Sequence, residues 1–225
     1  MLSECFEPEF LENGYSRFVT RKSESIKQYT KKNMANYYPG FLAHIRKYVE
    51  LSESEVKILG KYVYPIEMRR REYLINVGEV CKHNYFVEEG CLRMFCYTDK
   101  MVEQTTQFAL ETWWISDYFS LMQQSLSQYA IQAVEKSVVV AVDYSLQDKL
   151  FSEVPQMERY FRIMMQRALA ASQLRVKLIY QYSKEEMYTH FVTSYPQFFL
   201  RVPQYMIASY LGLTPEYLSE LRKRR

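Results

Sequence analysis

The last 25 residues most restrict how this chain can fold, because two short apolar segments there flank a single glycine. Pro203 suits the first turn of one helix, and Gly212 suits the left-handed position that ends it. Thr214 is a good N-cap for a second helix that would begin at Pro215. Ala208 leaves room for the helices to cross, and the apolar residues spaced to bury the crossing are Ile207, Leu211, Leu213, Leu218 and Leu221. The spacing predicts a helix-turn-helix, with a plain helical hairpin as the alternative.

Charge favours a nucleic-acid-binding role for this terminal segment. Its basic residues, Arg201 included, outweigh its two glutamates by +3, which equals the net charge of the whole chain. Cations at the end of a recognition helix are placed to meet DNA phosphates. Double-stranded DNA is therefore the predicted partner, contacted through Thr214, Pro215, Glu216, Ser219, Glu220, Arg222, Lys223, Arg224 and Arg225.

The middle of the chain has the pattern of an antiparallel β-structure. After Pro65, short runs rich in β-branched and aromatic residues recur at spacings of about 8–15 residues. Gly78 and Gly90 stand at turn positions between such runs. No long helical pattern interrupts them, which favours a β-roll of the double-stranded β-helix or jelly-roll type. The segment before the β-roll has helical spacing and a capping box from Ser52 to Glu55.

A long helix without internal glycine or proline is predicted from Pro155 to Tyr182. Its apolar residues alternate four and three apart, as in a coiled coil, and small residues in the middle would let two helices approach closely. The predicted dimer seam consists of Met157, Phe161, Met164, Ala168 and Ala171. The alternative is an amphipathic helix that packs on its own domain. A further capping box, Ser183 to Glu186, opens the terminal helical segment.

Enzyme and metalloprotein classes find no support in the sequence. The six glycines are isolated, so no phosphate-binding loop can be written. None of the four cysteines has a CxxC spacing or a histidine nearby at ligand spacing, and the three histidines lie on separate segments. We expect no catalytic residues, no metal, no cofactor and reduced, buried thiols. An enzyme on a double-stranded β-helix would need a metal triad, and only His83 lies in the β-region.

The sequence also shows no recognisable targeting signal. No apolar run approaches the roughly 18–20 residues of a membrane span, and the acidic beginning is unlike a signal peptide. We therefore expect a cytoplasmic protein without a membrane partner. Residues 1–35 form a polar extension, interpreted as a solvated tail or, alternatively, as a basic arm on nucleic acid.

A β-roll, a long helix and a C-terminal helix-turn-helix, in that order, resemble the Crp–Fnr family of bacterial transcription regulators. The resemblance covers about residues 36–225 and is most specific in segments similar to a Bacteroidetes-type branch: FVEEGCLRMF at 86–95, FALETWWISDYFS at 108–120, PQMERYFRIMMQ at 155–166 and RVPQYMIASYLGLTPEYLSELRK at 201–223. It implies an α+β protein with a cyclic-nucleotide-binding-like sensor domain at 36–152, a dimerisation helix at 153–182 and a helix-turn-helix domain at 183–225, whereas the polar extension at 1–35 lies outside the match. It also implies a homodimer and allows RNA polymerase as a further partner.

The sequence departs from the family where cyclic AMP binds. Members that bind it carry Gly-Glu on a short helix and Arg-Ser or Arg-Thr on the next strand, and the arginine neutralises the phosphate. Aligned on WISDYFSL and YAIQA, the candidate effector pocket here consists of Ser116, Asp117, Ser127, Gln128 and Tyr129. No arginine lies between Arg93 and Arg159, so we expect no cyclic AMP binding and leave the effector unidentified. An apolar or aromatic effector would fit the nearby rings of Trp113, Trp114, Tyr118 and Tyr129, unless these rings fill the core.

The sequence is thus interpreted as a dimeric DNA-binding transcription regulator with a degenerate effector pocket. A small-molecule-binding module with vestigial DNA binding is the alternative. In familiar family members the positions of Pro215, Glu216 and Glu220 read bases as Arg, Glu and Arg, so only Glu216 keeps its counterpart. We expect a DNA site unlike the family's well-known palindrome, with more weight on phosphate contacts.

Overall fold

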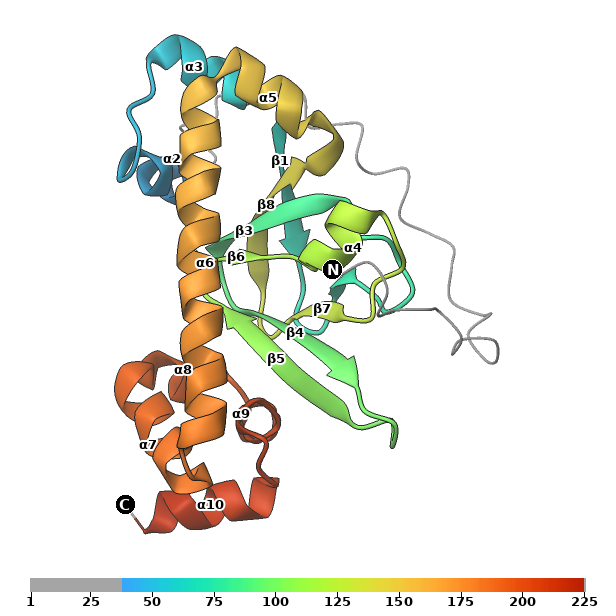
Figure 1. Ribbon diagram of the computed structural model, residues 1–225, viewed down its shortest axis with the longest axis vertical. Helices are drawn as coiled ribbons and strands as arrows, with labels where there is room; N and C mark the ends of the chain where they lie inside the picture. Colours follow the sequence, from blue (N-terminus) through green and yellow to red (C-terminus); the bar gives the residue numbers. More distant parts are fainter. Residues whose placement is uncertain (1–37, 225) are drawn as a thin grey trace. The chain divides into compact units, whose positions relative to one another are not determined.

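The structure, a computed structural model, describes residues 38–224, which lie within the compact unit Lys31–Arg225 (Figure 1). The predicted extension at 1–35 and the residues Cys5 and Arg225 lie outside the described residues. The elements are α2 (Pro39–Arg46), α3 (Glu53–Leu59), β1 (Val63–Met68), β2 (Tyr73–Ile75), β3 (His83–Glu89), β4 (Leu92–Tyr97), β5 (Glu103–Ala109), β6 (Trp114–Ile115), α4 (Tyr118–Gln123), β7 (Ala130–Ala133), β8 (Ser137–Asp143), η2 (Tyr144–Leu146), α5 (Gln147–Glu153), α6 (Pro155–Gln181), α7 (Lys184–Ser194), α8 (Pro196–Arg201), α9 (Gln204–Leu211) and α10 (Pro215–Lys223).

The strands form two four-stranded antiparallel sheets that pack as a β-roll. One sheet has the order β1-β8-β3-β6 and the other β2-β7-β4-β5. Side chains that alternate inward, among them Leu92, Ile131 and Val139, are fully buried between the sheets. Gly78 and Gly90 have φ of +86° and +99°, as their predicted turn positions require. The predicted α+β class with an antiparallel β-roll is confirmed.

The short helix α2 is capped by a carboxylate from the β-roll. Glu88 of β3 accepts hydrogen bonds from the backbone amides of Gly40 and Phe41, both at 2.7 Å. The N-cap residue, Tyr38, supplies no side-chain cap of its own. Glu88 therefore satisfies amides that a helix start would otherwise leave unpaired, and its charge suits the positive end of the helix dipole.

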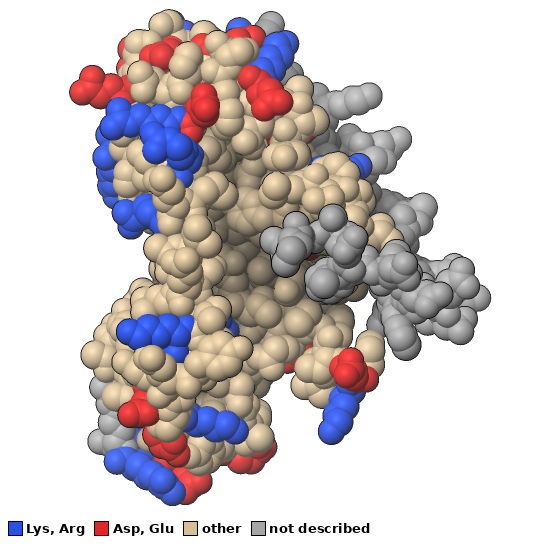
Figure 2. Space-filling view, in the orientation of Figure 1, with Lys and Arg blue, Asp and Glu red and all other residues tan. Residues whose placement is uncertain are grey.

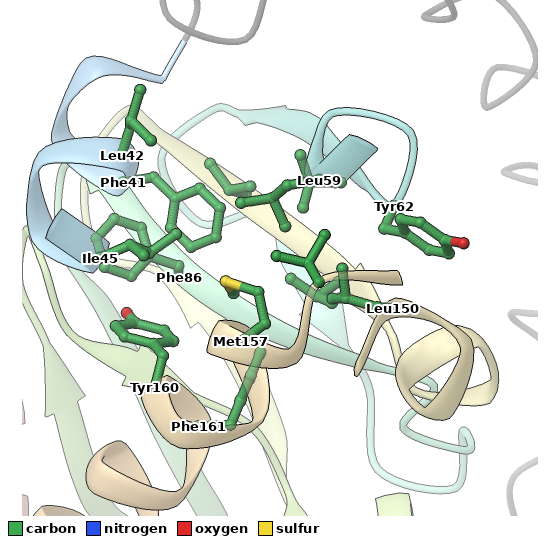
Figure 3. Close-up of a cluster of buried hydrophobic side chains, with 14 of the residues drawn as sticks. Phe41, Leu42, Ile45, Leu59, Tyr62, Phe86, Leu150, Met157, Tyr160 and Phe161 are labelled. Carbon is green, nitrogen blue, oxygen red and sulfur yellow. The ribbon is translucent and has the colours of Figure 1, made fainter. Parts of the chain in front are cut away.

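The first half of α6 belongs to the core of its own subunit (Figure 3). Met157, Phe161 and Met164 are each at most 7 % exposed. They pack with residues of α2, α3, α5 and the β-roll that include Phe41, Ile45, Leu59, Phe86 and Leu150. The first three residues of the predicted dimer seam therefore pack on the subunit's own elements, and the seam itself stays a prediction.

A hydrogen-bonded aromatic cluster fixes α6 against α2 and the β-roll. Trp114 Nε1 donates to the hydroxyl of Tyr160 at 3.0 Å, so the hydroxyl proton is left for His44 Nδ1 at 2.8 Å. Burial, reinforced by the positive charges of Lys47 and Arg167, lowers the pKa of His44 to about 4. His44 is therefore neutral at neutral pH and can accept that proton.

The helices α7 to α10 form a C-terminal helical unit (Figure 1). Both predicted capping boxes are present, at the starts of α3 and α7. One apolar cluster joins the unit to the outer face of the sheet β2-β7-β4-β5. In it, Phe108 of β5 contacts Phe198 of α8 with ring centroids 5.4 Å apart. The β-roll and the C-terminal unit thus share a core.

Candidate nucleic-acid interface

The turn between α9 and α10 has the geometry that the sequence predicts. Gly212 takes φ +66°, and the next amide, of Leu213, donates to the carbonyl of Ala208 at 2.9 Å. Ala208 is fully buried, as a close helix crossing requires. Pro203 differs slightly from expectation, because it is the N-cap residue of α9 instead of lying in its first turn.

The second helix, α10, is capped at its N-terminus and packs on α9 through one apolar side. Thr214 Oγ1 accepts from the amide of Tyr217 at 3.2 Å, and Pro215 occupies the first helical position. Leu218 and Leu221 are buried in the cluster that contains the apolar residues of α9. The predicted helix-turn-helix is confirmed.

The remaining side of α10 is polar and open to solvent. All of the predicted DNA contacts that the structure describes are exposed: Thr214, Pro215, Glu216, Ser219, Glu220, Arg222, Lys223 and Arg224. Glu220 forms an ion pair with Arg224 one turn later. Acidic and basic side chains are mixed at this end of the molecule (Figure 2). The surface can therefore offer acceptors to bases and cations to phosphates, with a small net positive charge.

Arg201, which the sequence groups with the DNA-facing cations, is neutralised within the protein. Its Nη1 and Nη2 donate to the two carboxylate oxygens of Glu111 at 2.8 and 2.6 Å, and its Nε donates to Glu135 Oε1 at 2.9 Å. The hydrogen bonds from Arg201 lower the pKa of Glu111 to about 2. We call these three residues the Arg201 cluster. Sequence reasoning missed it because the carboxylates lie in loops between strands, far from Arg201 in the chain.

The candidate effector residues lie on two adjacent segments, before α4 and before β7. Ser116, Asp117 and Ser127 are buried, whereas Gln128 is exposed and Tyr129 is half-buried. Asp117 caps α4, because its Oδ1 accepts from the amides of residues 119 and 120 at 3.1 and 3.2 Å. Its Oδ2 accepts from Ser127 Oγ at 2.6 Å. The structure brings Asp117 and Ser127 together, but the carboxylate that would meet a ribose hydroxyl is already hydrogen-bonded.

A buried arginine does occur in the β-roll, on β4. Arg93 donates from Nη2 to Glu103 Oε2 at 2.7 Å and from Nε to Gln132 Oε1 at 3.0 Å. Its guanidinium lies 4.1 Å from the ring centroid of Phe95. With these partners in place, Arg93 is not a free cation for a ligand phosphate.

The aromatic residues near the candidate pocket have structural partners. Trp114 packs against the cluster that includes the start of α6. Trp113 contacts Tyr195 and Phe198 of the C-terminal unit, with ring centroids 6.2 and 6.1 Å apart. The hydroxyl of Tyr118 is buried and has no hydrogen-bond partner among the described residues. The core-filling alternative therefore agrees with the structure for Trp114, whereas Trp113 is 37 % exposed.

The second half of α6 carries exposed apolar side chains. Leu169, Val176 and Tyr180 are 61, 52 and 85 % exposed, and their spacing of seven and four residues places them on one side of the helix. We call them the outer stripe. Arg175 lies on another side, where its guanidinium is 3.8 Å from the ring centroid of Tyr210 in the subunit's own α9. The sequence analysis did not single out the stripe, because it placed the predicted seam on another side of the helix.

Metal sites and membrane-spanning helices can be assessed only for the described residues. Between residues 38 and 224, no three His, Cys, Asp or Glu side chains are grouped to hold a metal ion. In the same range no helix is long and apolar enough to cross a membrane. Cys81, Cys91 and Cys96 are free thiols, and burial raises the pKa of Cys81 to about 11. A thiol in this environment stays protonated and unreactive.

The fold and the exposed side of α10 together define a class of protein: a cyclic-nucleotide-binding-like β-roll joined by one long helix to a helix-turn-helix unit. Solved structures share this fold. FixK2 from Bradyrhizobium japonicum matches with a TM-score of 0.62 at 20 % identity, over 72 % of this chain and 83 % of that one. A putative regulator of the crp/fnr family from Eubacterium rectale matches with a TM-score of 0.59 at 14 % identity, over 84 % and 87 %.

Sequence relatives point to the same family, although no family model matches the chain. The transcriptional activator protein Anr of Pseudomonas aeruginosa is 26 % identical over 170 residues, which cover 70 % of this chain and 68 % of the relative. The fumarate and nitrate reduction regulatory protein of Vibrio cholerae is 25 % identical over 188 residues, which cover 77 % and 74 %. The chain is thus similar to Crp–Fnr family proteins, and the relatives that it matches are transcription regulators.

Proposed function

We propose that this protein is a homodimeric transcription regulator that binds double-stranded DNA through α10. The observation that supports this most directly is the polar, exposed side of a capped helix whose leucines are buried against α9. A helix held in this way can enter the major groove with its first residues at base edges. Four arginines and lysines at its end supply phosphate contacts.

Selection of duplexes from a random pool tests the proposed function. We expect enrichment of a two-fold symmetric site whose half-sites are separated by about one or more helical turns of DNA. Repeating the selection with cell-extract metabolites tests for an effector. If no sequence is enriched under either condition, the alternative of a small-molecule-binding module with vestigial DNA binding is favoured instead.

Two single substitutions in α10 should have different effects on DNA binding. Glu216→Ala removes an acceptor for cytosine N4 and should relax preference at one position per half-site, by about 1–3 kcal/mol. Arg222→Ala removes a phosphate contact and should weaken binding to all DNA sequences alike. The dependence of this affinity on salt concentration should be shallower by about one counterion. Binding to matched and mismatched duplexes across a salt series measures both effects. Unchanged affinity and salt slope in both variants would place α10 outside the groove.

We also propose that the outer stripe of α6 is the dimer contact. Its side chains are exposed in one subunit, and a second copy of the helix packed against them would remove them from water. Ala168 and Ala171, the remaining residues of the predicted seam, are exposed but follow Met164 on the side that faces the subunit's own fold. The partner-facing side is therefore assigned to Leu169, Val176 and Tyr180.

For the sensor domain, we propose a pocket that does not recognise the phosphate of a cyclic nucleotide. Arg93 is paired, and Asp117 is hydrogen-bonded to Ser127 and to the start of α4. A desolvated phosphate without a cationic partner is costly, so cyclic AMP should bind no tighter than about millimolar. Calorimetry with cyclic AMP, and with adenosine as the control without phosphate, provides the test. A micromolar dissociation constant for cyclic AMP, tighter than for adenosine, would contradict the proposal.

A further inference from the structure

The two carboxylates of the Arg201 cluster stand on the same two segments as the candidate effector residues. Glu111 lies five residues before Ser116, in the loop that leads into β6 and α4. Glu135 lies six residues after Tyr129, at the far end of β7. Each segment therefore connects the candidate effector region to Arg201 over a short length of chain.

Both segments are fastened at each end. At one end Ser127 Oγ donates to Asp117 Oδ2 at 2.6 Å, which joins the segments to each other. At the other end Arg201 donates to both carboxylates. Between them, residues 112 and 113 exchange backbone hydrogen bonds of 2.9 Å with Val87 of β3. A hydrogen-bonded segment of this kind transmits a displacement instead of absorbing it in loose chain.

The C-terminal unit rests on the β-roll at a second place, the edge of β5. The amide of Thr105 donates to Ser209 Oγ at 2.8 Å, and this hydroxyl donates to the carbonyl of Glu103 at 2.8 Å. Ser209 belongs to α9, the first helix of the helix-turn-helix. Arg201 ends α8, two residues before the N-cap of α9. The two contacts thus bracket the helix on which α10 is packed.

We propose that Arg201 couples the candidate effector region to the helix-turn-helix unit within one subunit. A displacement of α4 or β7 moves Glu111 or Glu135, which changes how firmly Arg201 holds the start of α9. This route runs beside the dimer helix and does not need a second subunit. The biological role of this coupling rests on the proposed function. The coupling itself is between two sites of the protein without DNA.

Amide hydrogen exchange of the full-length protein without DNA tests this coupling. Arg201→Gln should speed exchange in α9 and α10 by about tenfold, because the polar anchor at the start of α9 is lost while the apolar contacts with the β-roll remain. Asp117→Asn, at the opposite end of the route, should speed the same amides about three- to tenfold. In the double variant Asp117→Asn should add nothing beyond Arg201→Gln, because the link is already broken. Asp143→Asn is the matched control, since Asp143 caps η2 by accepting from the amide of Ser145 at 2.8 Å but lies off the route.

Two results would overturn the proposal. One is an Asp117→Asn protein in which only α4 exchanges faster, and the other is a double variant in which the two effects multiply. Should Asp117→Asn fail to fold, Ser127→Ala breaks the same hydrogen bond with a smaller change. A wild-type protein that binds no DNA would contradict the proposed function but would leave this exchange experiment unaffected.

Discussion

A Val176→Glu protein should have the mass of one subunit at micromolar concentration and should lose most of its affinity for a two-fold symmetric DNA site. In the proposed dimer, Val176 faces its own copy in the middle of the outer stripe. Two carboxylates there would be desolvated without partners, at a cost of several kcal/mol. Loss of the second subunit removes simultaneous binding to two half-sites, so DNA affinity should fall about 100-fold or more. Light scattering gives the mass, and a DNA titration gives the affinity.

Two further variants, both alanine-to-glutamate substitutions, separate the possible faces of α6. Ala170→Glu adds the same charge beside Leu169 but off the outer stripe, so this protein should stay dimeric. Ala168→Glu should also stay dimeric if the outer stripe is the contact, whereas the seam predicted from the sequence requires monomers. A monomeric Ala168→Glu protein together with a dimeric Val176→Glu protein would return the interface to the sequence-predicted side.

Gly90→Ala should destabilise the protein by about 3 kcal/mol or more, because strain and overlap act together at this position. Gly90 has φ +99°, which side-chain-bearing residues rarely adopt. An added Cβ would lie 2.2 Å from Ser137 Oγ and 2.7 Å from the backbone carbonyl oxygen of Lys136. Backbone atoms at the start of β8 cannot turn away as a flexible side chain can. Chemical denaturation of the purified variant measures the loss.

Gly78→Ala is the matched control for that experiment. Gly78 has φ +86°, but no atom lies within 4 Å of its added Cβ. It should therefore lose only the conformational part, about 1 kcal/mol. Equal losses in the two variants would show that overlap with the strand at Ser137 has no energetic weight.

The helix-turn-helix could be predicted from the sequence because its determinants are local. Gly212 ends one helix, Thr214 begins the next, and the leucines that bury the crossing lie within the same 25 residues. The capping boxes of α3 and α7 are local for the same reason, since each joins residues three positions apart. Alternation and turn glycines were likewise enough to predict an antiparallel β-roll.

Which side of α6 packs on its own subunit could not be predicted in the same way. An apolar repeat shows that one side of a helix is covered, but not whether the cover is a second copy or the subunit itself. Here the residues that pack on α6 are close in space but distant in sequence. An example is the hydrogen bond from Tyr160 to His44, 116 residues away. The Arg201 cluster has the same character, because its partners lie 66 and 90 positions from Arg201.

Because its cap comes from Glu88 of β3, α2 is synthesised before the β-roll but becomes stable only after β3 has folded. Eight residues are too few for a helix to persist alone in water, and the amides of Gly40 and Phe41 find their acceptor only on β3. A ribosome delivers α2 before that strand exists. The first of the described helices to be synthesised must therefore wait for the β-roll, and a nascent chain that stops before residue 88 should hold this segment as coil.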